Sequence, residues 1–288
     1  MLITCSLAVG GQAPERPPEK AFTPVGRMDA VIKESSGIAK SLKYEGIFWT
    51  HGDSGNPAAL FAIRADGTLV ATVPVVEAVN LDWEDVAIAD GFVYVGDIGN
   101  NYGWLRVRTV YKFAEPDPYA GCIEPVKPAL TYHYKFPEGP FDAEALVVRR
   151  EQIYIIRKTA GPTSAVYHLT PADNGYFGLA KVQDLRAAWI TGADLSADGR
   201  YLVTVSGFQL TCHPVNEDLT LRVDETPRSV SFPPSGQIEA CCFDGGDVLL
   251  TSEEGFIYRI TAEDLARQTR FVSPRVEGRA ASSRPEGQ

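Results

Sequence analysis

A repeat constrains the fold of this chain more than any other feature of its sequence. Five segments each begin with small or acidic residues and run into an apolar strand, and their starts are 46 to 60 residues apart. These segments are residues 34–39, 82–87, 142–147, 191–196 and 237–242. The spacing is close to the ~40 to 50 residues of a four-stranded propeller blade.

Further strands follow each segment. The second strands are expected at residues 47–50, 93–95, 153–156, 201–205 and 248–251. In the first unit, third and fourth strands at residues 59–64 and 69–73 are joined by the hairpin signal Ala65-Asp66-Gly67-Thr68. Helical periodicity is confined to a short turn at residues 262–267. The sequence therefore predicts an all-β, five-bladed β-propeller of antiparallel four-stranded blades.

The last unit supplies about three strands, so we expect residues 25–32 to add the fourth and close the ring with an N-terminal strand. The alternative is a six-bladed ring with a hidden unit in residues 101–141. In either case the propeller is expected to span residues 22–274. Residues 1–21 are then a flexible leader or signal remnant, and residues 275–288 a disordered tail.

Composition excludes several functions. The formal net charge of −10 argues against binding to nucleic acid or to anionic membrane surfaces. No apolar run approaches the ~20 residues of a transmembrane helix. Residues 1–11 have the small, apolar character of the end of an export signal, so we expect an exported protein, periplasmic or extracellular, with lipid attachment at Cys5 as an option. We also expect a monomer. A Cys122–Cys212 disulfide and free thiols both remain open.

The repeat also predicts a site. In a propeller the starts of the inner strands and the ends of the second strands meet at one mouth of the central channel. Carboxylates about 6 Å apart would repel by roughly 3 kcal/mol per pair at an effective dielectric of about 20. A hard cation relieves that repulsion, and an all-oxygen environment suits Ca²⁺. The candidate metal ligands are Glu84, Glu144 and Glu239, which share one register, and Asp194.

The acidic residues also have a structural interpretation. Carboxylates on inner strands can accept hydrogen bonds from backbone amides of the neighbouring blade, with no ligand involved. Asp85 and Asp194 fit this interpretation best.

Other residues near the mouth are candidates for proton transfer or substrate contact. Asp53, His51 and Asp97 are the candidate acid/base groups. The candidate substrate-binding residues are Asn101, Trp104, Lys158, Ser54 and Glu253. Residues 51–55 share letters with the nucleophile loop of serine proteases, but no matching His and Asp segments accompany them, so Ser54 is expected in a turn or rim. Trp83 is expected to pack between blades, and Trp104 to face a ligand such as a sugar ring.

These blocks resemble those of a largely uncharacterised family of bacterial β-propeller proteins, many of them exported. The matching blocks are Glu34 to Gly37, Asp53 to Gly55, Asp82 to Asp85, Gly96 to Asn101, Asp142 to Ala145, Thr191 to Gly199, and Glu239-Ala240. Asn100 stands where the family pattern has an acidic residue. A more distant likeness, to the calcium-dependent gluconolactonase-like propellers, implies a metal at the channel mouth and is one of architecture.

Three functions follow from this sequence. The first is a metal-assisted hydrolase that acts on an ester or lactone, a phosphoester or a glycoside of a small molecule or sugar. The second is a non-catalytic propeller that binds a small ligand or glycan at the same mouth. In the third, the carboxylates are purely structural.

Overall fold

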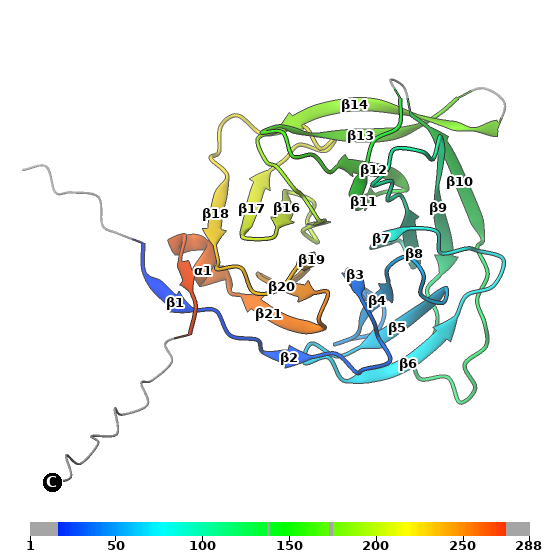
Figure 1. The fold of residues 1–288 in the computed structure, drawn as a ribbon, viewed down its shortest axis with the longest axis horizontal. Coiled ribbons are helices and arrows are strands. Elements are labelled where there is room, and N and C mark those ends of the chain that lie inside the picture. The colour runs from blue at the N-terminus through cyan, green and yellow to red at the C-terminus, as the bar shows by residue number, and fades with distance from the viewer. Residues whose placement is uncertain (1–16, 137–138, 173–174, 275–288) are drawn as a thin grey trace, which may run out of the picture.

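The computed structural model describes residues 17–136, 139–172 and 175–274. The expected leader up to residue 16, including Cys5, and the expected tail from residue 275 lie outside these residues. The regular secondary structure of the described residues is almost entirely β-strand, and the sheets are arranged around a central axis (Figure 1). Residues 19–21, which we expected in the flexible leader, instead form strand β1 (Glu19–Ala21).

The first sheet has the strand order β3-β4-β5-β6 and is antiparallel throughout. Its strands are β3 (Ser35–Lys40), β4 (Phe48–Gly52), β5 (Ala59–Ile63) and β6 (Leu69–Pro74). The predicted hairpin at residues 65–68 is confirmed. There Gly67 has a φ of 90°, which favours glycine, and the Thr68 N–H donates to Asp66 Oδ1.

The next two four-stranded groups merge into one eight-stranded sheet. The strands of the first group are β7 (Trp83–Ala89), β8 (Phe92–Asp97), β9 (Val107–Ala114) and β10 (Leu130–Lys135). Those of the second are β11 (Ala143–Arg149), β12 (Gln152–Arg157), β13 (Ser164–Pro171) and β14 (Phe177–Leu185). A short parallel pairing of β10 with β14 joins them. Residues 101–141, where a hidden blade was an alternative, thus supply β9 and β10 to the same group as β7 and β8.

A six-stranded sheet follows, with the order β1-β22-β18-β17-β16-β15. Its strands, besides β1, are β15 (Gly192–Leu195), β16 (Tyr201–Ser206), β17 (Gln209–Pro214), β18 (Arg228–Ser231) and β22 (Arg270–Val272). Helix α1 (Ala262–Arg267), at the position of the expected helical turn, begins with a capping box between Thr261 and Asp264.

The last sheet joins the two ends of the described chain. Strands β19 (Ile238–Asp244), β20 (Asp247–Ser252) and β21 (Phe256–Ile260) come from late in the sequence. Strand β2 (Gly26–Arg27) pairs antiparallel with β21 and is the fourth strand. The N-terminal strand expected within residues 25–32 is therefore present, although only two residues long.

The inner strands β3, β7, β11, β15 and β19 contact one another in cyclic order, and β19 returns to β3. Figure 1 looks down this ring. Hydrophobic clusters fill the spaces between neighbouring sheets. Trp49 and Trp83, for example, are fully buried in one cluster between the first sheet and the β7–β10 group, as expected for Trp83. Packing between sheets thus fixes the positions of the inner strands.

The described residues contain no helix long and apolar enough to cross a membrane. All four described cysteines are free thiols. Cys241 and Cys242 are buried, whereas Cys122 is exposed and Cys212 half-buried. The open question of a Cys122–Cys212 pairing is thus answered in favour of free thiols.

Candidate metal centre

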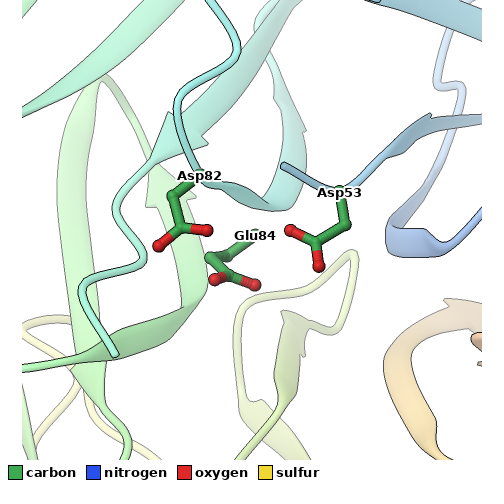
Figure 2. Close-up of side chains that lie close together, drawn as sticks. All are labelled: Asp53, Asp82 and Glu84. Atoms are coloured by element: carbon green, nitrogen blue, oxygen red, sulfur yellow. The ribbon is translucent and has the colours of Figure 1, made fainter. Parts of the chain in front are cut away.

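Three carboxylates from two neighbouring sheets point toward one another at one end of the ring (Figure 2). Asp53 follows the end of β4, Asp82 precedes β7, and Glu84 is the second residue of β7. One carboxylate oxygen of each lies within 4.8 Å of the others. The start of an inner strand and the end of a second strand therefore do meet at one mouth.

A second group shares Glu84 with the first. Asp142 precedes β11 and Glu144 is its second residue, and their oxygens lie within 4.8 Å of each other and of Glu84. The sequence Asp-x-Glu occurs at the start of both strands, so the same local layout is built twice. Glu84 links the two groups into one acidic centre of five carboxylates, which we call the mouth cluster: Asp53, Asp82, Glu84, Asp142 and Glu144.

A recurring β-bulge aims these glutamates at the axis. The pairing register shifts between Trp83 and Asp85 in β7, between Ala143 and Ala145 in β11, and between Ile238 and Ala240 in β19. The skipped residues are Glu84, Glu144 and Glu239, which therefore leave the ladder. A bulge bends its strand and re-aims a side chain. The shared register inferred from sequence thus has a structural cause.

The mouth cluster is poorly solvated. Glu84 is only 5% exposed and Glu144 only 3%. Burial raises the pKa of Glu84 well above its usual range, and the charges of Glu144 and Asp53 raise it further. Burial likewise raises the pKa of Asp82 and of Asp53. Each group would be more stable with a proton or beside a cation.

One cation already lies beside the mouth cluster. Lys158, just after β12, forms an ion pair with Glu144 Oε1. Burial opposes the charge on Lys158, but the Glu144 carboxylate outweighs it and raises the lysine pKa. Burial also raises the pKa of Glu144, and Lys158 only partly offsets this. Lys158 therefore neutralises part of the cluster and leaves most of its charge uncompensated.

The Glu144 carboxylate also has an unused oxygen. Its Oε2 is buried and has no hydrogen-bond partner, although Oε1 is paired with Lys158. A buried acceptor without a partner is costly by about 1–3 kcal/mol. Glu144 belongs to the Glu84–Asp142–Glu144 group, so this residue brings an unsatisfied acceptor to the cluster.

The backbone packs tightly against the other end of the cluster. A Cβ atom placed on Gly99 would lie 2.0 Å from Glu84 Oε1 and 2.5 Å from the Asp82 carboxylate. A side chain at this position would therefore displace the two carboxylates. The Ser36 hydroxyl donates to Glu84 Oε2 over 3.1 Å and fixes that side chain from the neighbouring inner strand.

Glu239 departs from the predicted ligand set. It lies at the bulge of β19 and is buried, and its negative charge raises the pKa of both Glu144 and Lys158. It is not, however, part of either close group of carboxylates among the described residues. Burial raises its pKa to about 7. Glu239 is therefore placed to exchange a proton near neutral pH rather than to complete the mouth cluster.

The prediction of Asp194 as a metal ligand is wrong. Its Oδ1 accepts the Leu195 N–H and its Oδ2 accepts the Phe243 N–H on the neighbouring inner strand, at 2.7 and 2.8 Å. It also lines a cavity of about 400 Å³ at the opposite end of the inner strands. Asp85 joins β7 to β11 in the same way, through the Leu146 N–H. Both residues confirm the structural interpretation.

Two of the expected acid/base groups have other partners. Asp97 forms a buried ion pair with Arg108 at 2.9 Å and accepts the Asp82 N–H, so it orients the start of β7. His51 is fully buried, packs edge-on against Trp83, and has a pKa lowered to about 4 by burial. It is thus a neutral packing residue, and the expectation that it lines the mouth is wrong.

The remaining candidates lie at or near the surface. Ser54, Asn101 and Glu253 are exposed. The charge of Glu253 raises the pKa of Asp53, and the charge of Lys158 lowers it. Ser54 lies in a turn in which its own N–H donates to the Asp53 carboxylate. Trp104 is largely exposed on the connection between β8 and β9.

Sequence reasoning placed Asp82 and Asp142 at the mouth but did not select them as ligands. Their signal was available in the repeated Asp-x-Glu motif. The role of Asn100 was also missed: its N–H donates to Asp142 Oδ1 at 2.7 Å, and its side chain closes the following loop. The uncharged residue at position 100 therefore supports a member of the cluster.

The donor chemistry of the mouth cluster fits a hard divalent cation. All the clustered atoms are carboxylate oxygens, which Ca²⁺ and Mg²⁺ prefer, and nitrogen or sulfur ligands are absent from the two groups. At 4.8 Å, each charged pair repels by about 3 kcal/mol at an effective dielectric of about 20. The unpartnered Glu144 oxygen adds an acceptor that a cation would satisfy.

Comparisons with known proteins concern the fold. No family model matches the sequence, and no curated protein matches it. Among solved structures, the nidogen/laminin complex superposes with a TM-score of 0.51 at 12% identity, covering 82% of this chain and 78% of that chain. The PQQ-bound aldose sugar dehydrogenase from Streptomyces coelicolor gives 0.48 at 11% identity, covering 85% and 99%.

A gluconolactonase from Xanthomonas campestris gives a TM-score of 0.43 at 12% identity, covering 86% of this chain and 95% of that chain. At such identities the likeness concerns the fold alone. The ring of sheets in Figure 1, whose inner strands contact one another in cyclic order, identifies an all-β protein of the β-propeller class. The propeller expected from the sequence is thus confirmed.

Proposed function

We propose that the mouth cluster binds a divalent cation, Ca²⁺ in the first instance, and that the protein is a cation-dependent hydrolase of a small molecule. The observation that carries the proposal is the pair of overlapping carboxylate groups joined by Glu84. Asp53, Asp82, Glu84, Asp142 and Glu144 would hold the ion. Calcium takes six to eight oxygen ligands, so carboxylates and solvent can share the coordination sphere.

The chemistry follows from the residues around the cluster. A bound cation would polarise a carbonyl, phosphoryl or glycosidic oxygen of the substrate. Glu239, with a pKa of about 7, can accept a proton from an attacking water and return it to the leaving group. Lys158 places a positive charge beside the same mouth and favours the negative charge that develops in the transition state.

A second function is favoured by one observation. The ion pair between Lys158 and Glu144 already neutralises part of the cluster without any metal. With protons on Glu84 and Glu239, the mouth would carry less negative charge and would bind a ligand through hydrogen bonds without catalysis. This non-catalytic propeller is the alternative that the experiments below distinguish.

We also infer that the propeller has five blades. The inference is supported by the cyclic contacts of β3, β7, β11, β15 and β19, and by the pairing of β2 with β21 in the last sheet. A monomeric state and export from the cytoplasm stay predictions, which size-exclusion chromatography with light scattering and cell fractionation would test.

The proposed function is tested by calcium titration calorimetry of metal-stripped protein, followed by a screen of ester, lactone, phosphoester and glycoside substrates with and without the ion. We expect saturable binding of about one ion and turnover that EDTA abolishes and Ca²⁺ restores. Glu45→Gln is the matched control for glutamate-to-glutamine changes within the mouth cluster, because Glu45 is an exposed glutamate outside it. No binding of Ca²⁺, Mg²⁺ or Mn²⁺ would refute the cation site, and binding without turnover would favour the non-catalytic alternative.

A further inference from the structure

Two large aromatic side chains project into solvent from the connection between β8 and β9. Tyr102 is 78% exposed and Trp104 is 79% exposed. Their ring centroids lie 5.1 Å apart with an interplanar angle of 30°, so the two rings pack against each other. A pair of exposed aromatic rings in contact is typical of a ligand-contacting surface.

The loop that carries the two rings is tied to the mouth cluster. The Asn100 side chain accepts the Leu105 N–H at 3.1 Å and donates to the Leu105 carbonyl at 2.9 Å, which closes the loop at its base. The Asn100 N–H donates to Asp142 Oδ1 at 2.7 Å. Following this path of bonds, the Trp104 backbone lies within roughly 11 Å of the Asp142 carboxylate. One sugar ring and its substituents can span that distance.

Charge restricts the ligand that fits beside these rings. The basic side chains that form ion pairs at this end of the ring, Lys158 and Arg108, are paired with Glu144 and Asp97. The mouth cluster stays negative even with one divalent cation bound, so it repels phosphorylated ligands. A neutral polyhydroxylated ring has no such penalty. Its hydroxyl groups can donate to carboxylates while the C–H groups of one face stack on an aromatic ring.

We propose that Tyr102 and Trp104 form a stacking platform that binds the pyranose ring of a neutral carbohydrate, with the bond to be cleaved directed toward the mouth cluster. This inference rests on the proposed function for the location of the reacting bond. It narrows the substrate class to neutral glycosides and neutral sugar esters or lactones and excludes sugar phosphates.

The platform can be tested by fluorescence. Trp49 and Trp83 are fully buried and Trp189 is half-exposed, so in a Trp189→Phe background Trp104 is the most exposed indole of the described chain. We would titrate this protein, with Ca²⁺ present, with methyl β-D-glucopyranoside, cellobiose, glucose 6-phosphate and choline. A neutral sugar should shift the emission to shorter wavelength and saturate, and glucose 6-phosphate should bind at least tenfold more weakly.

Calorimetry of Trp104→Ala and Tyr102→Ala then assigns the site. Each variant should bind the neutral sugar at least tenfold more weakly, whereas Phe208→Ala, which removes an exposed ring from the β16–β17 turn, should bind it normally. Unchanged sugar affinity in both platform variants, tighter binding of choline than of any sugar, or no saturable sugar binding would overturn the inference.

Calcium binding is measured separately in the same proteins, so that the two proposals can fail independently. Normal calcium binding without sugar binding defeats only the platform. Sugar binding that depends on Trp104 but occurs without calcium binding supports the platform and defeats only the cation site.

Discussion

Replacement of Glu84 by glutamine should move the stability of the protein in opposite directions with and without calcium. Glu84 belongs to both carboxylate groups, is 5% exposed, and has a pKa raised mainly by burial. In metal-free protein the change removes a buried charge that repels its neighbours by about 3 kcal/mol per pair at full ionisation. Because raised pKa values let protons relieve part of that repulsion, we expect a gain of about 1–3 kcal/mol at pH 8.

Calcium should reverse this order. An ion at 100 times its Kd stabilises the wild-type fold by about 2.7 kcal/mol, which for a domain of this size raises Tm by roughly 5–10 °C. The Glu84→Gln variant lacks the shared ligand and should gain little from calcium.

The assay is differential scanning fluorimetry in EGTA and in excess Ca²⁺, with Glu45→Gln as the control. We expect the variant to melt higher than wild type in EGTA and lower in calcium. A variant that melts lower in both conditions, or an equal calcium shift in both proteins, would refute the reasoning.

Three further predictions follow from the same contacts. Metal-free protein should lose stability as pH rises from about 4.5 to 8. The pKa of Glu239 is raised from 4.5 to about 7 and those of Glu84 and Glu144 are also raised, so the folded state holds protons that the unfolded state releases. Thermal melts in EGTA across this pH range test the prediction, and a flat profile would contradict it. Asp194→Ala should lower the free energy of unfolding by about 2–4 kcal/mol, since two part-buried N–H groups lose their acceptor. Calcium affinity in calorimetry should be unchanged, and a loss of that affinity would return Asp194 to the ligand set. Arg108→Met should cost about 3–5 kcal/mol in urea unfolding because it leaves Asp97 buried without its partner, and Arg108→Met/Asp97→Asn should recover much of that loss; no recovery would mean that the ion pair is not the cause.

The sequence supported prediction of the fold because its signals are local and repeated. The segments at residues 82–87 and 142–147 start the inner strands β7 and β11, and the turn at residues 65–68 forms the predicted hairpin. The join between β10 and β14 was not predictable, because it depends on two short stretches, such as Tyr134 opposite Phe177, that carry no pattern of their own.

The site was predictable only in part, for a reason of geometry. Alternation along a strand decides which face a side chain takes, but a bulge adds one residue and changes it. Glu84 and Glu144 reach the mouth through bulges, whereas β15 pairs with β16 without a register shift and directs Asp194 to backbone amides. The burial of His51 was not predictable either, because it depends on contacts with another sheet, such as the packing of Trp83 against its ring, that the local sequence does not reveal.

Strands β1 and β22 run side by side in the same direction, with Glu19 opposite Arg270 and Ala21 opposite Val272. The entry of β1 and the exit of β22 are therefore separated by only about three residues of strand, or roughly 10 Å. A short peptide linker across that gap would allow the gene to be circularly permuted, with new ends cut into an exposed turn at the opposite end of the ring, such as the one at Gly245-Gly246 between β19 and β20. Such permutants would offer a site for immobilising or fusing the protein without altering the acidic end of the channel.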